Sequence, residues 1–91
     1  MDVKTLKQKL QAKENFALVD LREESEIKDG MIPSAIWIPL NTLNSRINEL
    51  PKDTKIVLYC ASGGRSSFAC MMLKGMGYDV ENLDGGMCSY K

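Results

Sequence analysis

The segment from Lys55 to Gly77 constrains the fold most strongly. It begins with Lys55-Ile56-Val57-Leu58-Tyr59, a β-branched and aromatic run that is typical of a buried strand. Cys60 follows directly, and a short glycine-containing loop leads into a segment whose apolar residues recur at helical spacing up to Gly77, a predicted C-terminal cap. A buried strand that passes within a few residues into a helix is typical of a parallel sheet covered on both faces.

The rest of the chain continues this alternation of apolar runs and amphipathic segments. Helices are predicted over 3–12, over one or two turns within 22–30, from Asn41 or Thr42 to Leu50 and over 66–76, and strands over 16–21, 35–38, 55–59 and 79–83. This order predicts an α/β fold, a three-layer α/β/α sandwich around a mainly parallel sheet of four or five strands. We expect residues 1–91 to form a single domain, because a chain of this length has no room for a second core.

Composition narrows the classes of function. The 12 basic and 12 acidic side chains are scattered along the chain, so we expect neither a nucleic-acid nor a membrane partner. No segment approaches the about 18 apolar residues that span a bilayer, and we expect a cytoplasmic protein. The three cysteines form no CxxC pair and histidine is absent. We therefore expect no metal site and no cofactor, and histidine-based acid–base catalysis is excluded within this chain.

Cys60 is the candidate nucleophile. Ligands of parallel sheets bind beyond the carboxyl ends of the strands, which is where Cys60 lies. A free thiol with a pKa of about 8.5 is mostly protonated at neutral pH, but a helix N-terminus or a guanidinium lowers that pKa. Both are near, since a helix is predicted to begin at about Ser66 and Arg65 closes the loop. Gly63 and Gly64 are expected to adopt positive φ angles and to turn N–H groups inward as an anion-binding nest.

The residues alone leave a simpler interpretation open. A single cysteine at a strand end is more often a small buried apolar residue, and a Gly-Gly pair is more often only a turn. The immediate succession of strand, cysteine, glycines, arginine and helix favours a functional thiolate or anion site. The hydroxyls of Ser62 and Ser66 are further candidate donors.

Three motifs stand in order along nearly the whole chain. The first is Leu18-Val19-Asp20-Leu21-Arg22-Glu23, followed by Glu26-Ile27 and by Gly30-Met31-Ile32-Pro33-Ser34-Ala35-Ile36-Trp37-Ile38-Pro39. The second is Tyr59-Cys60-Ala61-Ser62-Gly63-Gly64-Arg65-Ser66, and the third runs from Gly77-Tyr78 through Leu83-Asp84-Gly85-Gly86-Met87. Together they resemble the rhodanese-like domain family, with Met31 where that family commonly has histidine and Ser34 where it often has glycine.

The resemblance implies that Cys60 takes sulfane sulfur from a donor such as thiosulfate and holds it as a persulfide. The sulfur would then pass to a thiol, a cyanide-like acceptor or an acceptor protein. Arg65 would be catalytic with Cys60, and the substrate-binding residues would be Ala61, Ser62, Gly63, Gly64, Ser66, Arg22 and Asp20. Loop amides and Arg65 would stabilise both the anionic donor and the released thiolate, so no general base is needed.

Two other functions stay open. A rhodanese-like module could instead bind a protein partner without catalysis or sense oxidants, although the retained cysteine, glycines and arginine disfavour a dead module. Phosphatase or arsenate reductase activity ranks lower. The resemblance implies that such relatives use a loop one residue longer than the four residues between Cys60 and Arg65.

Residues outside the loop have competing interpretations. Asp20 and Arg22 could border the pocket, or could form an ion pair that ties the first strand to the next loop. Cys70 is predicted to pack in the core, while a resolving or second sulfur-carrying role stays open for Cys88. The glutamates at 23, 24 and 26 are expected to form a solvated helical face. The final helix is expected to be short or missing, which would open one flank of the site.

Overall fold

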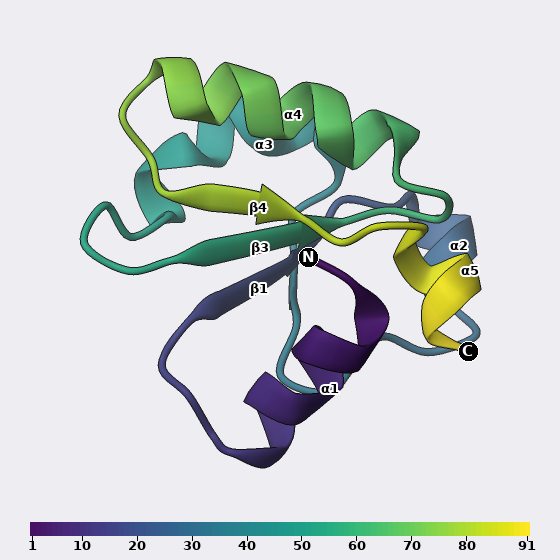
Figure 1. Cartoon of the computed structure of the whole chain (residues 1–91). Coiled ribbons are helices and arrows are strands. Elements are labelled where there is room, and N and C mark those ends of the chain that lie inside the picture. The colour runs from purple at the N-terminus through teal and green to yellow at the C-terminus, as the bar shows by residue number, and fades with distance from the viewer.

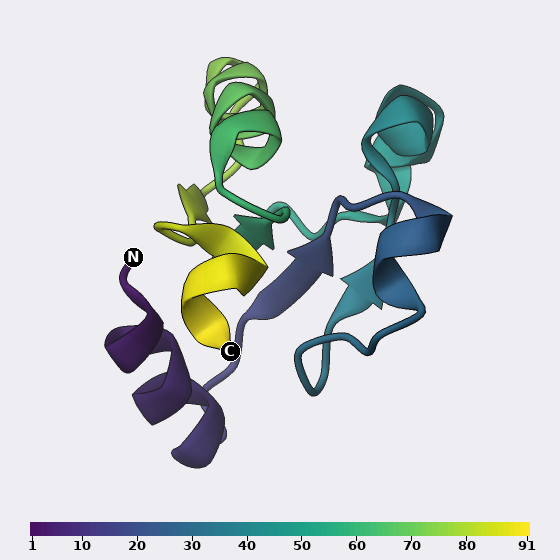
Figure 2. The ribbon, with the colours of Figure 1, turned by 90° about the vertical axis from the view of Figure 1, so that its right-hand side faces the viewer.

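The computed structural model describes all 91 residues, and its helices lie on both faces of one sheet. In chain order the elements are α1 (Val3–Gln11), β1 (Ala17–Asp20), α2 (Glu24–Ile27), β2 (Ile36–Trp37), the 3-10 turn η1 (Leu40–Thr42), α3 (Leu43–Arg46), the 3-10 turn η2 (Ile47–Glu49), β3 (Ile56–Tyr59), α4 (Gly64–Gly75), β4 (Val80–Asn82) and α5 (Gly86–Tyr90). The four strands stand in the order β2-β1-β3-β4, and every neighbouring pair is parallel. Helices α3 and α4 cover one face, and α1 and α5 the other (Figure 1, Figure 2). The predicted α/β/α sandwich is confirmed, with four strands.

The two central strands are continuous apolar runs because each has a core on both sides. Val19 of β1 and Leu58 of β3 belong to the core cluster that includes Leu73 of α4. Their neighbours Leu18, Val57 and Tyr59 belong to the second cluster, on the side of α1 and α5. Alternate residues of a strand point to opposite faces, so a four-residue strand supplies both cores.

Strand register brings the candidate residues to one edge of the sheet. Asp20 of β1 lies beside Tyr59 of β3, and the amide of Leu21 donates to the carbonyl of Tyr59 at 2.9 Å. Arg22 and Cys60 therefore leave adjacent strands at the same carboxyl edge. None of the helices has the length and apolar character needed to cross a membrane.

The segment predicted as one helix up to Leu50 is broken into η1, α3 and η2. Thr42 caps no helix amide, since its hydroxyl donates to the carbonyl of Pro39 at 3.0 Å, and the hydroxyl of Ser45 donates to the carbonyl of Thr42 at 2.9 Å. These short polar side chains compete with the backbone for hydrogen bonds, which disfavours a regular helix.

The C-terminal helix is short but present, and it is attached to the residues that follow β3. The amide of Met87 donates to the carbonyl of Cys60 and the amide of Cys88 to that of Ala61, both at 2.9 Å. Gly86 makes this approach possible. Its φ is +57°, and a Cβ there would overlap the carbonyl oxygens of Cys60 and Ala61.

We predict that Gly86→Ala lowers the free energy of unfolding by about 2 kcal/mol, because it adds a strained φ and a steric overlap. Gly75→Ala is the matched control, since Gly75 lies in α4 with open space where its Cβ would stand. It should leave stability unchanged or raise it by up to about 1 kcal/mol. Urea unfolding measures both, and equal effects of the two substitutions would contradict the prediction.

Candidate functional site

Cys60 lies directly after β3 and is only 1% exposed. Its Sγ accepts hydrogen bonds from the amide of Gly63 at 3.1 Å and from the hydroxyl of Ser66 at 3.4 Å. Gly63, with φ +103°, turns the chain into the 12-residue helix α4. The first amides of a helix have no partner within it, and they carry its positive end. The sulfur therefore lies at a place built to hold negative charge.

The reactive loop (residues 60–65) differs from the predicted nest in one respect. Only Gly63 has a positive φ, whereas Gly64 is already the first residue of α4. The prediction for Gly64 was therefore wrong, and α4 begins two residues before the predicted Ser66. Of the other loop residues, Ser62 is exposed and Ala61 is half-buried.

The pKa of the Cys60 thiol lies below its ordinary value. Burial by itself raises the pKa, but the hydroxyl of Ser66 and the amides of Ser66, Gly63 and Ser62 stabilise the thiolate and outweigh it. Loop amides and one hydroxyl thus stabilise this thiolate without the imidazole that often accompanies a nucleophilic cysteine.

Asn82 of β4 is a site residue that sequence reasoning missed. The hydroxyl of Ser66 has one proton, and Cys60 Sγ, the Gly63 carbonyl and Asn82 Oδ1 all lie within hydrogen-bonding distance of it. Asn82 Nδ2 also donates to the Gly63 carbonyl at 3.4 Å. Asn82 therefore competes with the sulfur for the hydroxyl proton. No motif signals this role, which arises because Asn82 pairs with Leu58 in the sheet.

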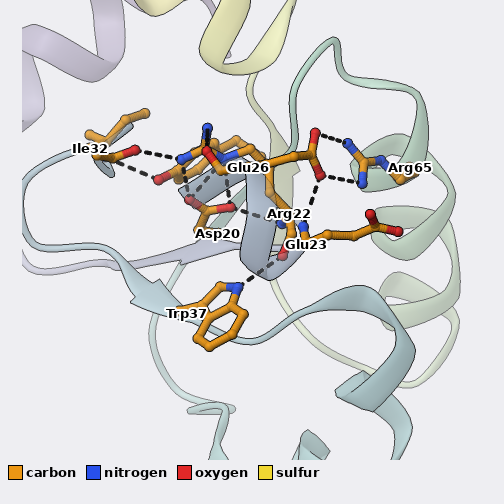
Figure 3. A network of polar contacts seen from close by, with 9 residues as sticks. Asp20, Arg22, Glu23, Glu26, Ile32, Trp37 and Arg65 are labelled. Atoms are coloured by element: carbon orange, nitrogen blue, oxygen red, sulfur yellow. Dashed lines mark hydrogen bonds and ion pairs between the residues drawn. The ribbon is translucent and has the colours of Figure 1, made fainter. Parts of the chain in front are cut away.

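Asp20 and Arg22 form a buried ion pair at the end of β1 (Figure 3). Arg22 Nη2 lies 2.9 Å from Asp20 Oδ2, and the side chains are 4% and 0% exposed. The same guanidinium donates to the carbonyls of Gly30 at 2.8 Å and Glu26 at 3.2 Å. The structure thus has the predicted ion pair, and this pair ties β1 to α2 and the turn after it.

Arg65 is engaged by Glu26 of α2. Its Nη1 and Nη2 donate to the two carboxylate oxygens at 2.8 and 2.9 Å, and Figure 3 shows the two side chains pointing at each other. The hydrogen bonds from Arg65 lower the pKa of Glu26 to about 2. The expectation of a solvated face was therefore wrong for Glu26. The Leu18–Ile27 motif did contain this residue, but not its partner.

The two remaining cysteines lie in different surroundings. Cys70 lies in α4 and is buried in the core cluster, where burial raises the pKa of its thiol, as expected for a packing residue. Cys88 is exposed. A hollow beside the loop is lined by Arg22, Glu26, Asp29, Ala61, Met87, Cys88 and Lys91. Cys88 therefore borders the flank of the loop.

Comparison with known proteins extends the resemblance over the whole chain. The family model described as rhodanese-like domain matches residues 2–91. A protein named sulfurtransferase from Allochromatium vinosum is 43% identical over 91 residues, which cover 99% of this chain and 85% of the relative. The putative sulfurtransferase YtwF of Bacillus subtilis is 37% identical over 86 residues, covering 94% and 84%. The crystal structure of a rhodanese-like domain protein from Staphylococcus aureus matches with a TM-score of 0.95 at 32% identity, covering 100% of this chain and 89% of that one.

We predict that Asp20→Ala lowers the free energy of unfolding by about 3 kcal/mol, because it leaves Arg22 buried without its carboxylate. Glu49→Ala is the matched control. It breaks the exposed pair of Glu49 with Arg46, which should cost less than about 1 kcal/mol. Urea unfolding of both variants tests this, and similar losses would show that the buried pair is not a structural support.

We predict that Ser66→Ala raises the pKa of Cys60, because the thiolate loses its hydroxyl donor while burial still opposes the charge. The fraction of thiolate at neutral pH then falls. Ultraviolet absorbance of the thiolate against pH, corrected with the Cys60→Ala variant, measures the change. Ser67→Ala is the control, since Ser67 is exposed and lines a different hollow. Identical titrations of the two serine variants would refute the role of Ser66.

Proposed function

Since this chain belongs to the rhodanese-like domain family and its relatives are named sulfurtransferases, we propose that it is a sulfurtransferase carrying sulfur as a Cys60 persulfide. The observation that carries the proposal is the set of donors around Cys60 Sγ, the Gly63 amide at 3.1 Å and the Ser66 hydroxyl at 3.4 Å. Such fixed donors stabilise an anionic sulfur without reorganisation during the reaction.

In the first half-reaction the Cys60 thiolate attacks the sulfane sulfur of a donor such as thiosulfate. A new S–S bond forms, the S–S bond of thiosulfate breaks, and sulfite leaves with the electron pair. The persulfide carries the remaining negative charge, and the amides of the reactive loop stabilise it as they stabilised the thiolate.

In the second half-reaction a thiol, cyanide or an acceptor protein attacks the outer sulfur of the persulfide. The S–S bond to Cys60 breaks and its electron pair returns to the Cys60 sulfur, which regains its hydrogen bonds from Gly63 and Ser66. Neither step needs a general base in the protein, which suits a chain without histidine.

The remaining candidate residues divide by role. Cys60 is the nucleophile, and Arg65 contributes positive charge at the end of the reactive loop. Ala61, Ser62, Gly63, Gly64 and Ser66 form the cradle for the transferred sulfur. Asp20 and Arg22 are positioning residues: their ion pair at the end of β1 holds α2 next to the loop.

We predict that incubation with thiosulfate adds the mass of one sulfur atom to the intact protein. Cyanide should remove it as thiocyanate. Cys60→Ala should not gain the mass, whereas Cys70→Ala and Cys88→Ala should keep the gain, since only Cys60 has donors arranged around its sulfur. Intact-protein mass spectrometry reads out all four proteins.

Absence of a mass gain with both thiosulfate and an organic persulfide would overturn this proposal. The alternative, a module that senses oxidants, makes a different prediction. It requires fast formation of sulfenic acid at Cys60 under peroxide together with negligible sulfur transfer to cyanide.

A further inference from the structure

Each of the two guanidinium groups near the carboxyl end of β3 already has a carboxylate partner. Arg22 is held by Asp20, with both side chains at most 4% exposed. Arg65 is held by both oxygens of Glu26 at 2.8 and 2.9 Å. The amides of Gly63 and Ser66 already interact with the sulfur of Cys60. The sulfur itself is well stabilised, but no arginine without a carboxylate partner lies beside it to bind an anionic sulfur donor.

The charges around the loop are predominantly acidic where Arg65 lies. Arg65 forms an ion pair with Glu26, and Glu23 lines the same hollow as Arg65, so two carboxylates lie near one guanidinium. Glu26 and Asp29 line the hollow beside the loop, together with Lys91 and Arg22. Arg22 is paired with Asp20 and Glu26 with Arg65, so in this hollow Lys91 offsets only Asp29. An incoming dianion therefore meets net negative charge beside Arg65, where Glu23 is added, and no net positive charge in the hollow.

We propose that Glu26 is a specificity-determining residue that disfavours dianionic sulfur donors such as thiosulfate. By occupying Arg65, it makes the site prefer an organic persulfide whose carrier is neutral or positively charged. This inference rests on the proposed function. The loading step is then attack of the Cys60 thiolate on the outer sulfur of RSSH: its S–S bond breaks, and RS⁻ leaves with the electron pair and takes up the persulfide proton.

The cost to thiosulfate follows from the geometry of the ion pair. A dianion that contacts Arg65 must either replace Glu26 or share the guanidinium with it. That carboxylate is also held by the amide of Glu23 at 2.8 Å, so it stays beside the anion as a like charge. An organic persulfide has no second negative charge to place, and it leaves the Arg65–Glu26 pair intact.

The experiment compares sulfur loading from thiosulfate and from cysteamine persulfide, whose carrier bears an ammonium group. Glu26→Gln should raise kcat/KM for thiosulfate about fivefold, mainly through a lower KM, because removing one like charge near the site weakens the repulsion. It should not raise kcat/KM for cysteamine persulfide. Glu24→Gln is the matched control: Glu24 is an exposed carboxylate on the same helix and forms no ion pair with Arg65. It should change neither value by more than about twofold.

An unchanged or lower thiosulfate kcat/KM in a folded Glu26→Gln protein would overturn the inference. If that variant does not fold, the wild-type protein decides. Added salt screens the exposed carboxylates, so the rate with thiosulfate relative to cysteamine persulfide must rise with ionic strength. A constant or falling ratio would be equally decisive against the role of Glu26. Failure of the wild type to load sulfur from either donor is a separate result, which overturns the proposed function.

Discussion

The buried ion pair between Asp20 and Arg22 links the central sheet to the surroundings of the reactive loop. An arginine removed from water needs hydrogen-bond acceptors, and each of the three guanidinium nitrogens of Arg22 donates to Asp20 or to the carbonyl of Glu26 or Gly30. These carbonyls belong to α2 and the turn after it, so the requirement of one buried charge fixes where α2 lies. Helix α2 in turn presents the carboxylate of Glu26 to Arg65. The buried Asp20–Arg22 ion pair thus determines where the carboxylate of Glu26 lies relative to Arg65.

The chemistry of Cys60 depends on groups that do not titrate near neutral pH. Backbone amides and the Ser66 hydroxyl keep their donor character throughout that range, unlike an imidazole partner. The fraction of Cys60 present as thiolate near neutral pH therefore depends on the ionisation of Cys60 and not on that of a neighbour. Asn82 affects this fraction by competing for the hydroxyl proton of Ser66. Such a site tolerates the absence of histidine because sulfur transfer needs a stabilised anion more than a moving proton.

The fold could be predicted from sequence wherever the pattern reflects burial on two faces. The apolar runs of β1 and β3 exist because both faces are covered, and they placed Cys60 at the carboxyl edge correctly. The conformation of single loop residues was harder to predict. Gly63 and Gly64 are identical in sequence, and only the start of α4 decides which one takes the positive φ. Partners distant in the chain were not predictable, since nothing local connects Glu26 with Arg65, 39 residues away, or Ser66 with Asn82.

The attachment of α5 to the reactive loop has a consequence for the order of events during translation. The carbonyls of Cys60 and Ala61 are held by the amides of Met87 and Cys88, and Asn82 contacts Ser66. Residues emerge from the ribosome in sequence order, so Cys60 appears well before the residues that fix the loop around it. Until the segment up to residue 88 has been added, the nascent chain therefore carries Cys60 in a loop that lacks these contacts. The site takes its folded arrangement only once that segment has been made and has folded back onto the sheet.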